Sequence, residues 1–321
     1  MRLKHALPLA AMALLLLPNA AFSQSSQKTM TIIVPFAPGG SADGIARIVA
    51  TELGARLGRQ VIVEGKPGAG GTVGIMALAK APPDGDTLSV AATAALVINP
   101  HVPGAVAFDP LRELAPIAKL IDIPIVLVSN AKSGPHTIKE VIEKSKSKPD
   151  GLNFGTTGPT SGQRLAVELL KTMTGANLVH VPYRGSAPAV TAVLGEQIPL
   201  ASVDLTSAYP QIQGGMLIGL GVTSARRAKT APEIPAIAES VPGFDGSNGY
   251  IGLFAPAGTP AARIKDLSRM VADILAKPDV QEKIALLSVE PAYLDDAAYG
   301  AMLAGESAKW RDVLKSLPLQ N

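Results

Sequence analysis

The sequence contains no cysteine, few aromatic residues and only four histidines among its 321 residues. Without cysteine, the chain has no disulfides, no thiol catalysis and no metal site with cysteine ligands. Aromatic residues make up only 4% of the chain, which argues against stacking platforms for bases or sugars. His5 lies near the N-terminus, and no His-Glu-x-x-His motif or other close cluster of metal ligands occurs. We therefore expect no metal and no cofactor.

The chain also has no large excess of positive or negative charge. The chain carries 29 basic and 26 acidic residues, and two of the basic ones, Arg2 and Lys4, lie within the first 23 residues. The remainder is nearly neutral and has no clustered basic face, so we expect no binding to nucleic acid. Hydrophobic residues form 47% of the chain and charged residues 17%, a balance typical of a folded protein. The length suits two ordinary cores.

Common catalytic patterns are absent as well. Gly-x-Ser-x-Gly does not occur, and the turn 68–74 misses Gly-x-Gly-x-x-Gly because Val73 takes the last glycine position. The turn 38–41 is not followed by Gly-Lys-Ser/Thr, so it is not a phosphate loop of that type. His180 lies within a β-rich run, where a single histidine more often has a structural role. We expect no catalytic residues and a protein that is not an enzyme.

The N-terminal segment has the layout of a secretory signal peptide. A short positive region precedes an apolar run that ends near Pro18, and 21–23 offers small residues at a cleavage site. The apolar run is shorter than the ~20 residues that a spanning helix needs. We expect residues 1–23 to be cleaved, and the protein to be exported to a periplasm.

Alternating strand and helix patterns follow along the chain. Apolar residues after Ser41 recur at helical spacing, and Ser41 or Asp43 is expected to cap that helix. Short β-rich runs separated by helical runs and Gly/Pro turns indicate parallel α/β sheets. The stretch 117–129 is expected to be extended, broken by Pro124, and to carry the chain between two lobes. The run 250–255 is expected to cross back, which would allow hinge closure around a ligand.

Three turns join the end of a strand to the start of a helix, at 36–42, 68–72 and 156–161. A helix N-terminus leaves backbone N–H groups unpaired and carries a partial positive charge, so it suits an anion. Glycine lets the backbone approach the ligand, and Ser and Thr add hydroxyl donors. Such turns are also routine structural features, so none decides alone. Two of them from different lobes favour a carboxylate-binding cleft.

At these turns the sequence resembles the substrate-binding proteins of tripartite tricarboxylate transporters, the Bug family. The first match is Val-Pro-Phe-Ala-Pro-Gly-Gly-Ser-Ala-Asp at 34–43. The others follow in order at 63–74, 83–88, 154–161, 180–195, 223–226 and 252–260. The resemblance therefore extends over nearly the whole chain after the leader.

The resemblance implies a two-lobe periplasmic-binding-protein fold of type II character, with two mixed sheets flanked by helices and two hinge crossovers. Lobe 1 is expected at 24–126 and 250–321, and lobe 2 at 127–249. The implied function is capture of a small carboxylate (a di- or tricarboxylate, an acidic amino acid or an aromatic acid) and delivery to a membrane permease by transient docking. A sensor-input protein that signals occupancy to a membrane kinase is the alternative. We expect a monomer.

The resemblance also implies that two loops grip one carboxylate, the first at 36–43 and the second at 156–161. Asp43 and Arg47 are expected to pair and support the first loop. Arg164 stands where the family usually has histidine, and its guanidinium is a candidate to favour a doubly charged acid, although a surface arginine is an equally good interpretation. The expected ligand-binding residues are Phe36, Ala37, Gly39, Gly40, Ser41, Ala42, Thr93, Thr156, Thr157, Gly158, Thr160, Ser161, Arg164 and Asp204.

Overall fold

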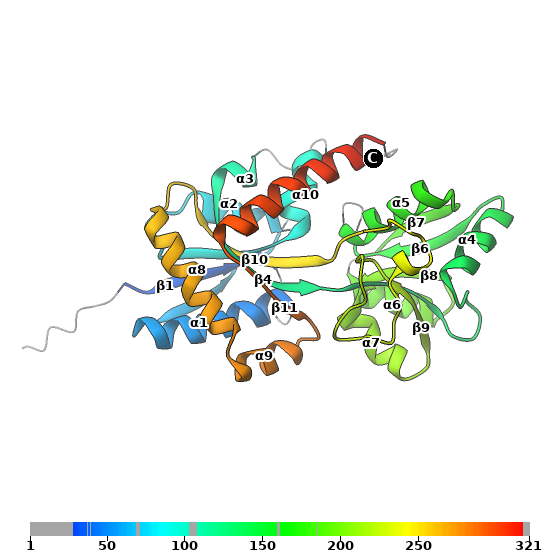
Figure 1. The fold of residues 1–321 in the computed structure, drawn as a ribbon, viewed down its shortest axis with the longest axis horizontal. Helices are drawn as coiled ribbons and strands as arrows, with labels where there is room; N and C mark the ends of the chain where they lie inside the picture. Colours follow the sequence, from blue (N-terminus) through cyan, green and yellow to red (C-terminus); the bar gives the residue numbers. More distant parts are fainter. Residues whose placement is uncertain are drawn as a thin grey trace, which may run out of the picture.

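A computed structural model describes residues 28–36, 38, 40–68, 71–102, 108–158, 161–183 and 185–316. The expected signal peptide and three of the expected site residues (Ala37, Gly39 and Thr160) lie outside these ranges. In Figure 1 the described chain forms two lobes, each with its own sheet, joined by extended segments. The predicted fold class, two mixed sheets flanked by helices, is confirmed.

The first lobe contains a six-stranded sheet in the order β11-β4-β10-β3-β1-β2. β1 runs parallel to β2 and β3, whereas β10 runs antiparallel to β3 and β4, and β11 antiparallel to β4. The alternating pattern thus predicted only the parallel part. The strands are β1 (Met30–Val34), β2 (Val61–Gly65), β3 (Thr87–Ala92), β4 (Leu114–Ile123), β10 (Gly249–Pro256) and β11 (Glu290–Leu294).

The second lobe contains a five-stranded sheet in the order β7-β6-β8-β5-β9. β6 is parallel to β7 and β8, and β5 is antiparallel to β8 and β9. The strands are β5 (Ile125–Asn130), β6 (Leu152–Thr156), β7 (Leu178–Pro182), β8 (Leu200–Asp204) and β9 (Leu217–Val222). This sheet uses only residues that lie between two visits of the chain to the first sheet.

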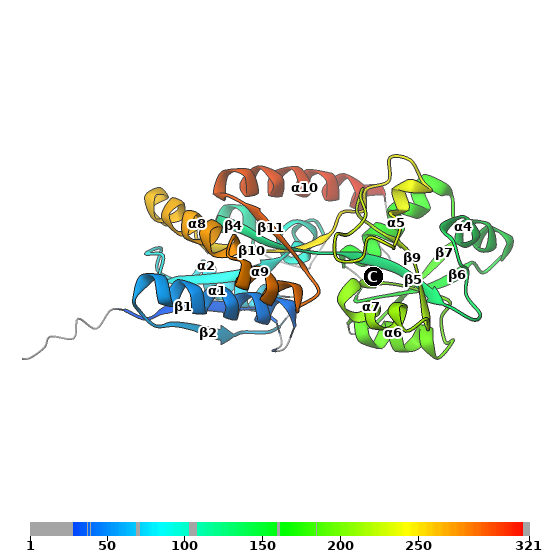
Figure 2. The same ribbon diagram turned by 60° about the horizontal axis from the view of Figure 1, so that its bottom comes forward.

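Helices cover both sheets (Figures 1 and 2). Those of the first lobe are α1 (Ser41–Leu57), α2 (Thr72–Ala79), α3 (Pro110–Glu113), α8 (Ala261–Leu275), α9 (Pro278–Ala285) and α10 (Asp296–Ser316). Those of the second lobe are α4 (Ile138–Ser147), α5 (Gly162–Thr174), α6 (Ser186–Leu194) and α7 (Leu205–Gln213). A π-helical turn, Ala94–Ile98, and short 3-10 turns at Asn99–His101 and Ile237–Glu239 complete the elements.

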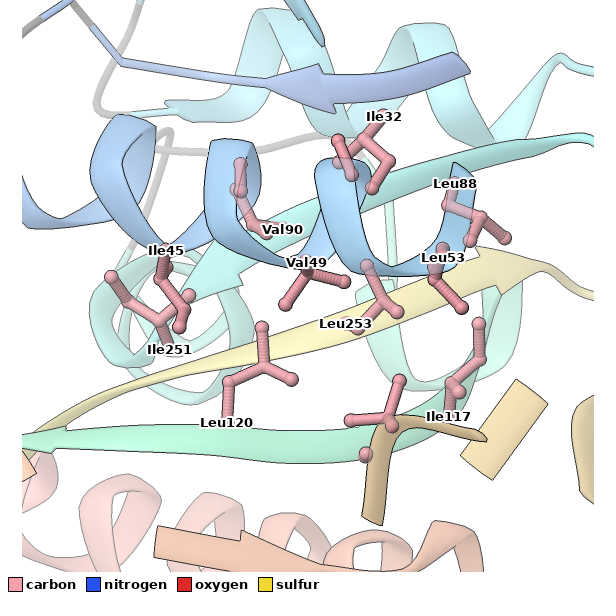
Figure 3. Packing of buried hydrophobic residues seen from close by; sticks show 14 of the residues in the cluster. Ile32, Ile45, Val49, Leu53, Leu88, Val90, Ile117, Leu120, Ile251 and Leu253 are labelled. Atoms are coloured by element: carbon pink, nitrogen blue, oxygen red, sulfur yellow. The ribbon is translucent and has the colours of Figure 1, made fainter. Parts of the chain in front are cut away.

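The helix α1 packs on the first sheet through one apolar stripe. Ile45, Val49 and Leu53 are fully buried and recur every four residues, which places them on one face. Figure 3 shows them against sheet residues such as Leu88 and Leu253. The helical spacing read from the sequence is confirmed here. This packing fixes the direction in which the start of α1 points.

The capping prediction for this helix is wrong. The N-cap position is Gly40, which has extended backbone and makes no side-chain cap hydrogen bond. Ser41 is already the first helical residue, so its hydroxyl lies one position too late for the usual cap. Asp43 is bound instead by Arg47, whose Nε donates to Oδ2 at 3.0 Å. The predicted pairing of Asp43 with Arg47 is confirmed.

The predicted extended stretch 117–129 is confirmed as β4 and β5, which belong to different sheets and meet at Pro124. The predicted extended run 250–255 is confirmed as part of β10. A further connection was not predicted. In Figures 1 and 2, α10 begins in the first lobe and reaches toward the second. Near its end, Lys309 Nζ donates to the Asp245 carbonyl oxygen at 3.1 Å and to Ser247 Oγ at 2.8 Å.

Replacing Gly252 with alanine should destabilise the protein by about 1–3 kcal/mol, the usual cost of overpacking a filled core. A Cβ at this position in β10 would lie 2.3 Å from the Tyr299 hydroxyl, and Tyr299 is fully buried. Urea unfolding measures the change in free energy. Gly305→Ala is the control, because Gly305 is exposed in α10 with nothing within 4 Å, so alanine should stabilise the helix slightly. Equal stability of Gly252→Ala and wild type would contradict the packing.

Candidate functional site

A cavity of about 720 Å³ lies between the two lobes. This volume is in the range of small-molecule sites. Its described lining combines glycine-containing turns, hydroxyl and amide side chains, and a few large apolar side chains. The lining residues are Phe36, Gly40, Ser41, Ala42, Ala92, Thr93, Ala94, Asn99, Ile123, Ile125, Thr157, Gly158, Ser161, Gly162, Gln163, Gly185, Ser186, Asp204, Thr206, Ser207, Gly246, Asn248, Gly249, Tyr250, Ile251 and Trp310.

The first-lobe wall is built by the end of β1 and the start of α1. Phe36, Gly40, Ser41 and Ala42 all line the cavity. The N-cap residue Gly40 makes no side-chain cap hydrogen bond, and the start of α1, where a helix carries partial positive charge, lies at this wall. The ring of Phe36 packs near Gly71, where an added Cβ would lie 3.3 Å from Phe36 Cζ. The aromatic ring therefore packs beside Gly71, the N-cap residue of α2.

Thr93 also lines the cavity. It lies between β3 and the π-helical turn and is buried. Its Oγ1 accepts from the Tyr250 backbone N–H at 2.9 Å and lies 3.4 Å from the Tyr250 carbonyl oxygen as a donor. Its hydroxyl is therefore engaged with β10, so Thr93 fixes the crossing strand at the cavity.

The second-lobe wall is built by the loop between β6 and α5. Thr157, Gly158 and Ser161 line the cavity. Ser161 is the N-cap of α5: its Oγ accepts from the Arg164 backbone N–H at 3.2 Å and donates to the Gly158 carbonyl oxygen at 2.9 Å. Here, in contrast to α1, a side chain closes the loop onto the helix. These two hydrogen bonds join Gly158 to the first turn of α5.

Thr156 is fully buried behind this wall and is not part of the cavity lining. Its Oγ1 lies 3.0 Å from the Gly158 carbonyl oxygen and accepts from the Gly158 N–H at 3.3 Å. The same oxygen lies 2.7 Å from His180 Nε2. Burial first, and then the positive charges of Arg164 and Lys171, lower the pKa of His180 to about 4. A neutral imidazole therefore supports the loop, as the structural interpretation of His180 proposed.

Asp204 ends β8 and lines the cavity on the second-lobe side. Gln163 Nε2 donates to its Oδ1 at 2.6 Å, and Ser186 Oγ donates to its Oδ2 at 3.2 Å. Burial raises the pKa of Asp204, and the two donors act in the opposite direction. Thr157 Oγ1 in turn donates to Gln163 Oε1 at 3.0 Å. A continuous chain of hydrogen bonds thus joins the loop after β6 to Asp204.

Arg164 lies in the first turn of α5 but outside the cavity lining. Its Nε faces Glu168 Oε1 at 3.6 Å, and Lys171 Nζ lies 2.7 Å from Glu168 Oε2. Glu168 is only 5% exposed, so its carboxylate needs these positive partners. The structure therefore places the guanidinium in an ion-pair group on α5.

Several lining residues were not predicted from the sequence. Gln163 and Ser186 each stand one or two positions inside a helix start, and a search for polar residues in first helical turns would have found them. Trp310, from α10, carries no local signal, because it is near the cavity only through the path of the C-terminal helix. Tyr250 begins the run 250–255 that was predicted to cross back, but it was not predicted to line the cavity.

No group of three or more His, Cys, Asp or Glu that could hold a metal ion occurs among the residues the structure describes. Within the same ranges, no helix combines the length and the apolar character needed to cross a membrane.

Comparison with known proteins identifies the family. The model of the tripartite tricarboxylate transporter family receptor matches residues 45–319. This chain belongs to that family. The family resemblance read from the sequence is thereby confirmed.

Solved structures agree with this assignment. The periplasmic binding protein BugD is 31% identical, with a TM-score of 0.75 and coverage of 90% of this chain and 97% of that chain. Rpa4515 of R. palustris, solved with adipate, is 28% identical, with a TM-score of 0.80 and coverage of 90% and 97%. MatC from Rhodopseudomonas palustris, with bound malate, is 28% identical, with a TM-score of 0.75 and coverage of 89% and 98%.

Ser161→Ala should lower the free energy of unfolding by about 1 kcal/mol, the usual value of an N-cap hydroxyl. Ser41→Ala, the same substitution at the other loop, should stay within about 0.5 kcal/mol of wild type because Ser41 caps nothing. Urea unfolding of the unliganded protein compares the two. A larger loss for Ser41→Ala would contradict the different roles of the two hydroxyls.

Stability should fall as the pH drops from 6.5 to 4. Because the pKa of His180 is about 4 in the folded protein and near 6.5 when unfolded, the unfolded chain binds the extra proton in this window. Since the side chain is partly exposed, we expect the effect to be about 1–2 kcal/mol after screening. His180→Gln should remove this part of the pH dependence in urea unfolding at pH 4–7. His136→Gln, at an exposed position, should keep it; equal slopes in the two variants would refute the assignment.

Proposed function

We propose that this protein captures a small carboxylate in the cavity between its lobes and delivers it to a membrane permease of the tripartite tricarboxylate type. One observation carries the proposal: the starts of α1 and α5, from different lobes, both line the same cavity of about 720 Å³. The family assignment and the adipate and malate in related structures support the same ligand class.

The chemistry of the two loops fits a carboxylate. Such a group accepts several hydrogen bonds from backbone N–H groups and hydroxyls, and it gains from the partial positive charge at helix starts. We propose that the first loop, 36–43, and the second loop, 156–161, hold one carboxylate between them. Gly40 and Ser41 supply the first side, and Thr157, Gly158 and Ser161 the second. Phe36 and Ala42 would contact the carbon skeleton.

The lobes would close on the ligand by a hinge, with lobe 1 at 24–126 and 250–321 and lobe 2 at 127–249. A ligand that contacts both walls binds the closed form better than the open form and so shifts the population toward closure. We propose that the closed monomer docks transiently on the permease in the periplasm, after removal of the signal peptide, and that it performs no catalysis.

A thermal-shift screen of the mature protein tests the proposal. The panel holds citrate-type acids, dicarboxylates, acidic amino acids, and benzoate- and phthalate-type aromatic acids, with the corresponding amides as neutral controls. A ligand present at 100 times its Kd should stabilise the protein by roughly 2.7 kcal/mol, a clear rise in Tm. We expect shifts from acids of one class and none from their neutral controls. Shifts from neutral compounds only would overturn the proposal.

Delivery is tested separately, by uptake of the labelled acid into cells that lack the gene. Uptake should fall strongly and return when the gene is restored on a plasmid. Unchanged uptake, with binding intact in the purified protein, would contradict delivery to a permease while leaving carboxylate capture in place.

A further inference from the structure

Asp204 is the only charged side chain in the described lining of the cavity. No lysine, arginine or histidine within the described ranges lines it. The cationic groups nearby, Arg47 and Arg164, contact Asp43 and Glu168 respectively. A cavity proposed to bind an anion thus has a fixed negative group on its second-lobe side.

The hydrogen bonds of Asp204 make its carboxyl group an acceptor, and they oppose the rise in pKa that burial causes. Both carboxylate oxygens accept from neutral donors, Gln163 Nε2 and Ser186 Oγ, and α7 begins at the next residue, which places a helix N-terminus beside the charge. Each carboxylate oxygen has more than one acceptor site, so each keeps capacity for a further donor. Asp204 also keeps part of its surface exposed.

The orientation of Gln163 makes this acceptor rigid. Its Oε1 accepts from Thr157 Oγ1 while its Nε2 donates to Asp204, and turning the amide over would place its oxygen against the Asp204 carboxyl group. Thr157 lies in the second loop, which we propose to hold the ligand carboxylate. The carboxylate-binding loop and the Asp204 acceptor are therefore held at a fixed separation by one chain of hydrogen bonds.

We infer that Asp204 binds a hydrogen-bond donor at the far end of the ligand, so that the substrate is a monocarboxylate that carries an ammonium, amide or hydroxyl group rather than a second carboxylate. This inference rests on the proposed function, because it assumes that the loops bind one carboxylate. A second carboxylate near Asp204 would meet a like charge, which acts against diacids. An ammonium or hydroxyl group would instead complete the acceptor sites of Asp204.

Isothermal titration with acids that differ only in their far end tests the inference. The four-carbon set is 4-aminobutyrate, 4-hydroxybutyrate, butyrate and succinate, and the same four end groups are tested at five and six carbons, ending with adipate. At the length that spans the cavity, an amino or hydroxy acid should bind at least about tenfold more tightly than the diacid, as expected for a hydrogen bond to a charged group. If the diacid binds most tightly, or if all four ends bind equally, the inference is overturned while the proposed function stands. If no acid of any set binds and the broader panel also fails, the proposed function itself fails.

The variant Asp204→Asn assigns the preference to this residue. Asparagine keeps the size of the side chain and removes the charge, so the preference for the ammonium end over the carboxylate end should fall about tenfold. Asp150→Asn is the control, since it removes the same charge at an exposed position outside the lining. An unchanged preference in Asp204→Asn would overturn the assignment. If that variant does not fold, the wild-type series still decides between donor and carboxylate ends.

Discussion

The cleft depends on Pro124, where one extended segment leaves the first sheet and enters the second. Pro124 has no N–H group to donate to either ladder, and β4 ends at Ile123 before it and β5 begins at Ile125 after it. The Pro124 carbonyl oxygen accepts from the Leu205 N–H at 2.8 Å, and Ile125 pairs with Asp204. The crossing is thus attached directly to the strand end that carries the charged group of the cavity.

The return crossing is held by the packing of β10 against α10. Gly252 leaves room for the buried ring of Tyr299. The Tyr250 N–H donates to Oγ1 of Thr93, which lines the cavity. Farther along α10, Glu306 accepts from Trp310 Nε1 at 2.8 Å and from Ser247 Oγ at 3.2 Å. Because Trp310 also lines the cavity, the C-terminal helix links the ligand space to the segment that precedes β10. The proposed closure of the lobes would have to be accommodated by these contacts as well as by the two strands.

The described cavity walls present mainly backbone and hydroxyl groups, the groups that we propose bind the carboxylate. Arginines beside both loops are already occupied, Arg47 by Asp43 and Arg164 by Glu168. Their role is to support helices whose first turns face the cavity. In the proposed function, backbone N–H groups would recognise the carboxylate but not the rest of the ligand, so other lining groups would supply the discrimination.

Several local elements could be predicted from the sequence by itself. The stripe Ile45, Val49, Leu53, the break at Pro124 and the loop–helix starts at 36–43 and 156–161 all depend on neighbours a few residues away, and a linear pattern records such neighbours. The family followed from the same motifs. Elements without a strong pattern, such as α7, β11 and the π-helical turn at Ala94–Ile98, were missed, and Ser41 was wrongly read as a cap because one residue of register is not visible in the sequence.

Only the tertiary structure decided which side chains meet at the cavity. Arg164 and Gln163 are adjacent on α5, yet the guanidinium faces Glu168 while the amide faces Asp204, from a strand some forty residues later. Trp310 reaches the cavity from the far end of the chain. The sequence determined the local starts and ends because short-range sterics and backbone hydrogen bonds set them. The tertiary structure determined which side chains contact one another at the cavity, because helix rotation and sheet register bring together residues that are far apart in the chain.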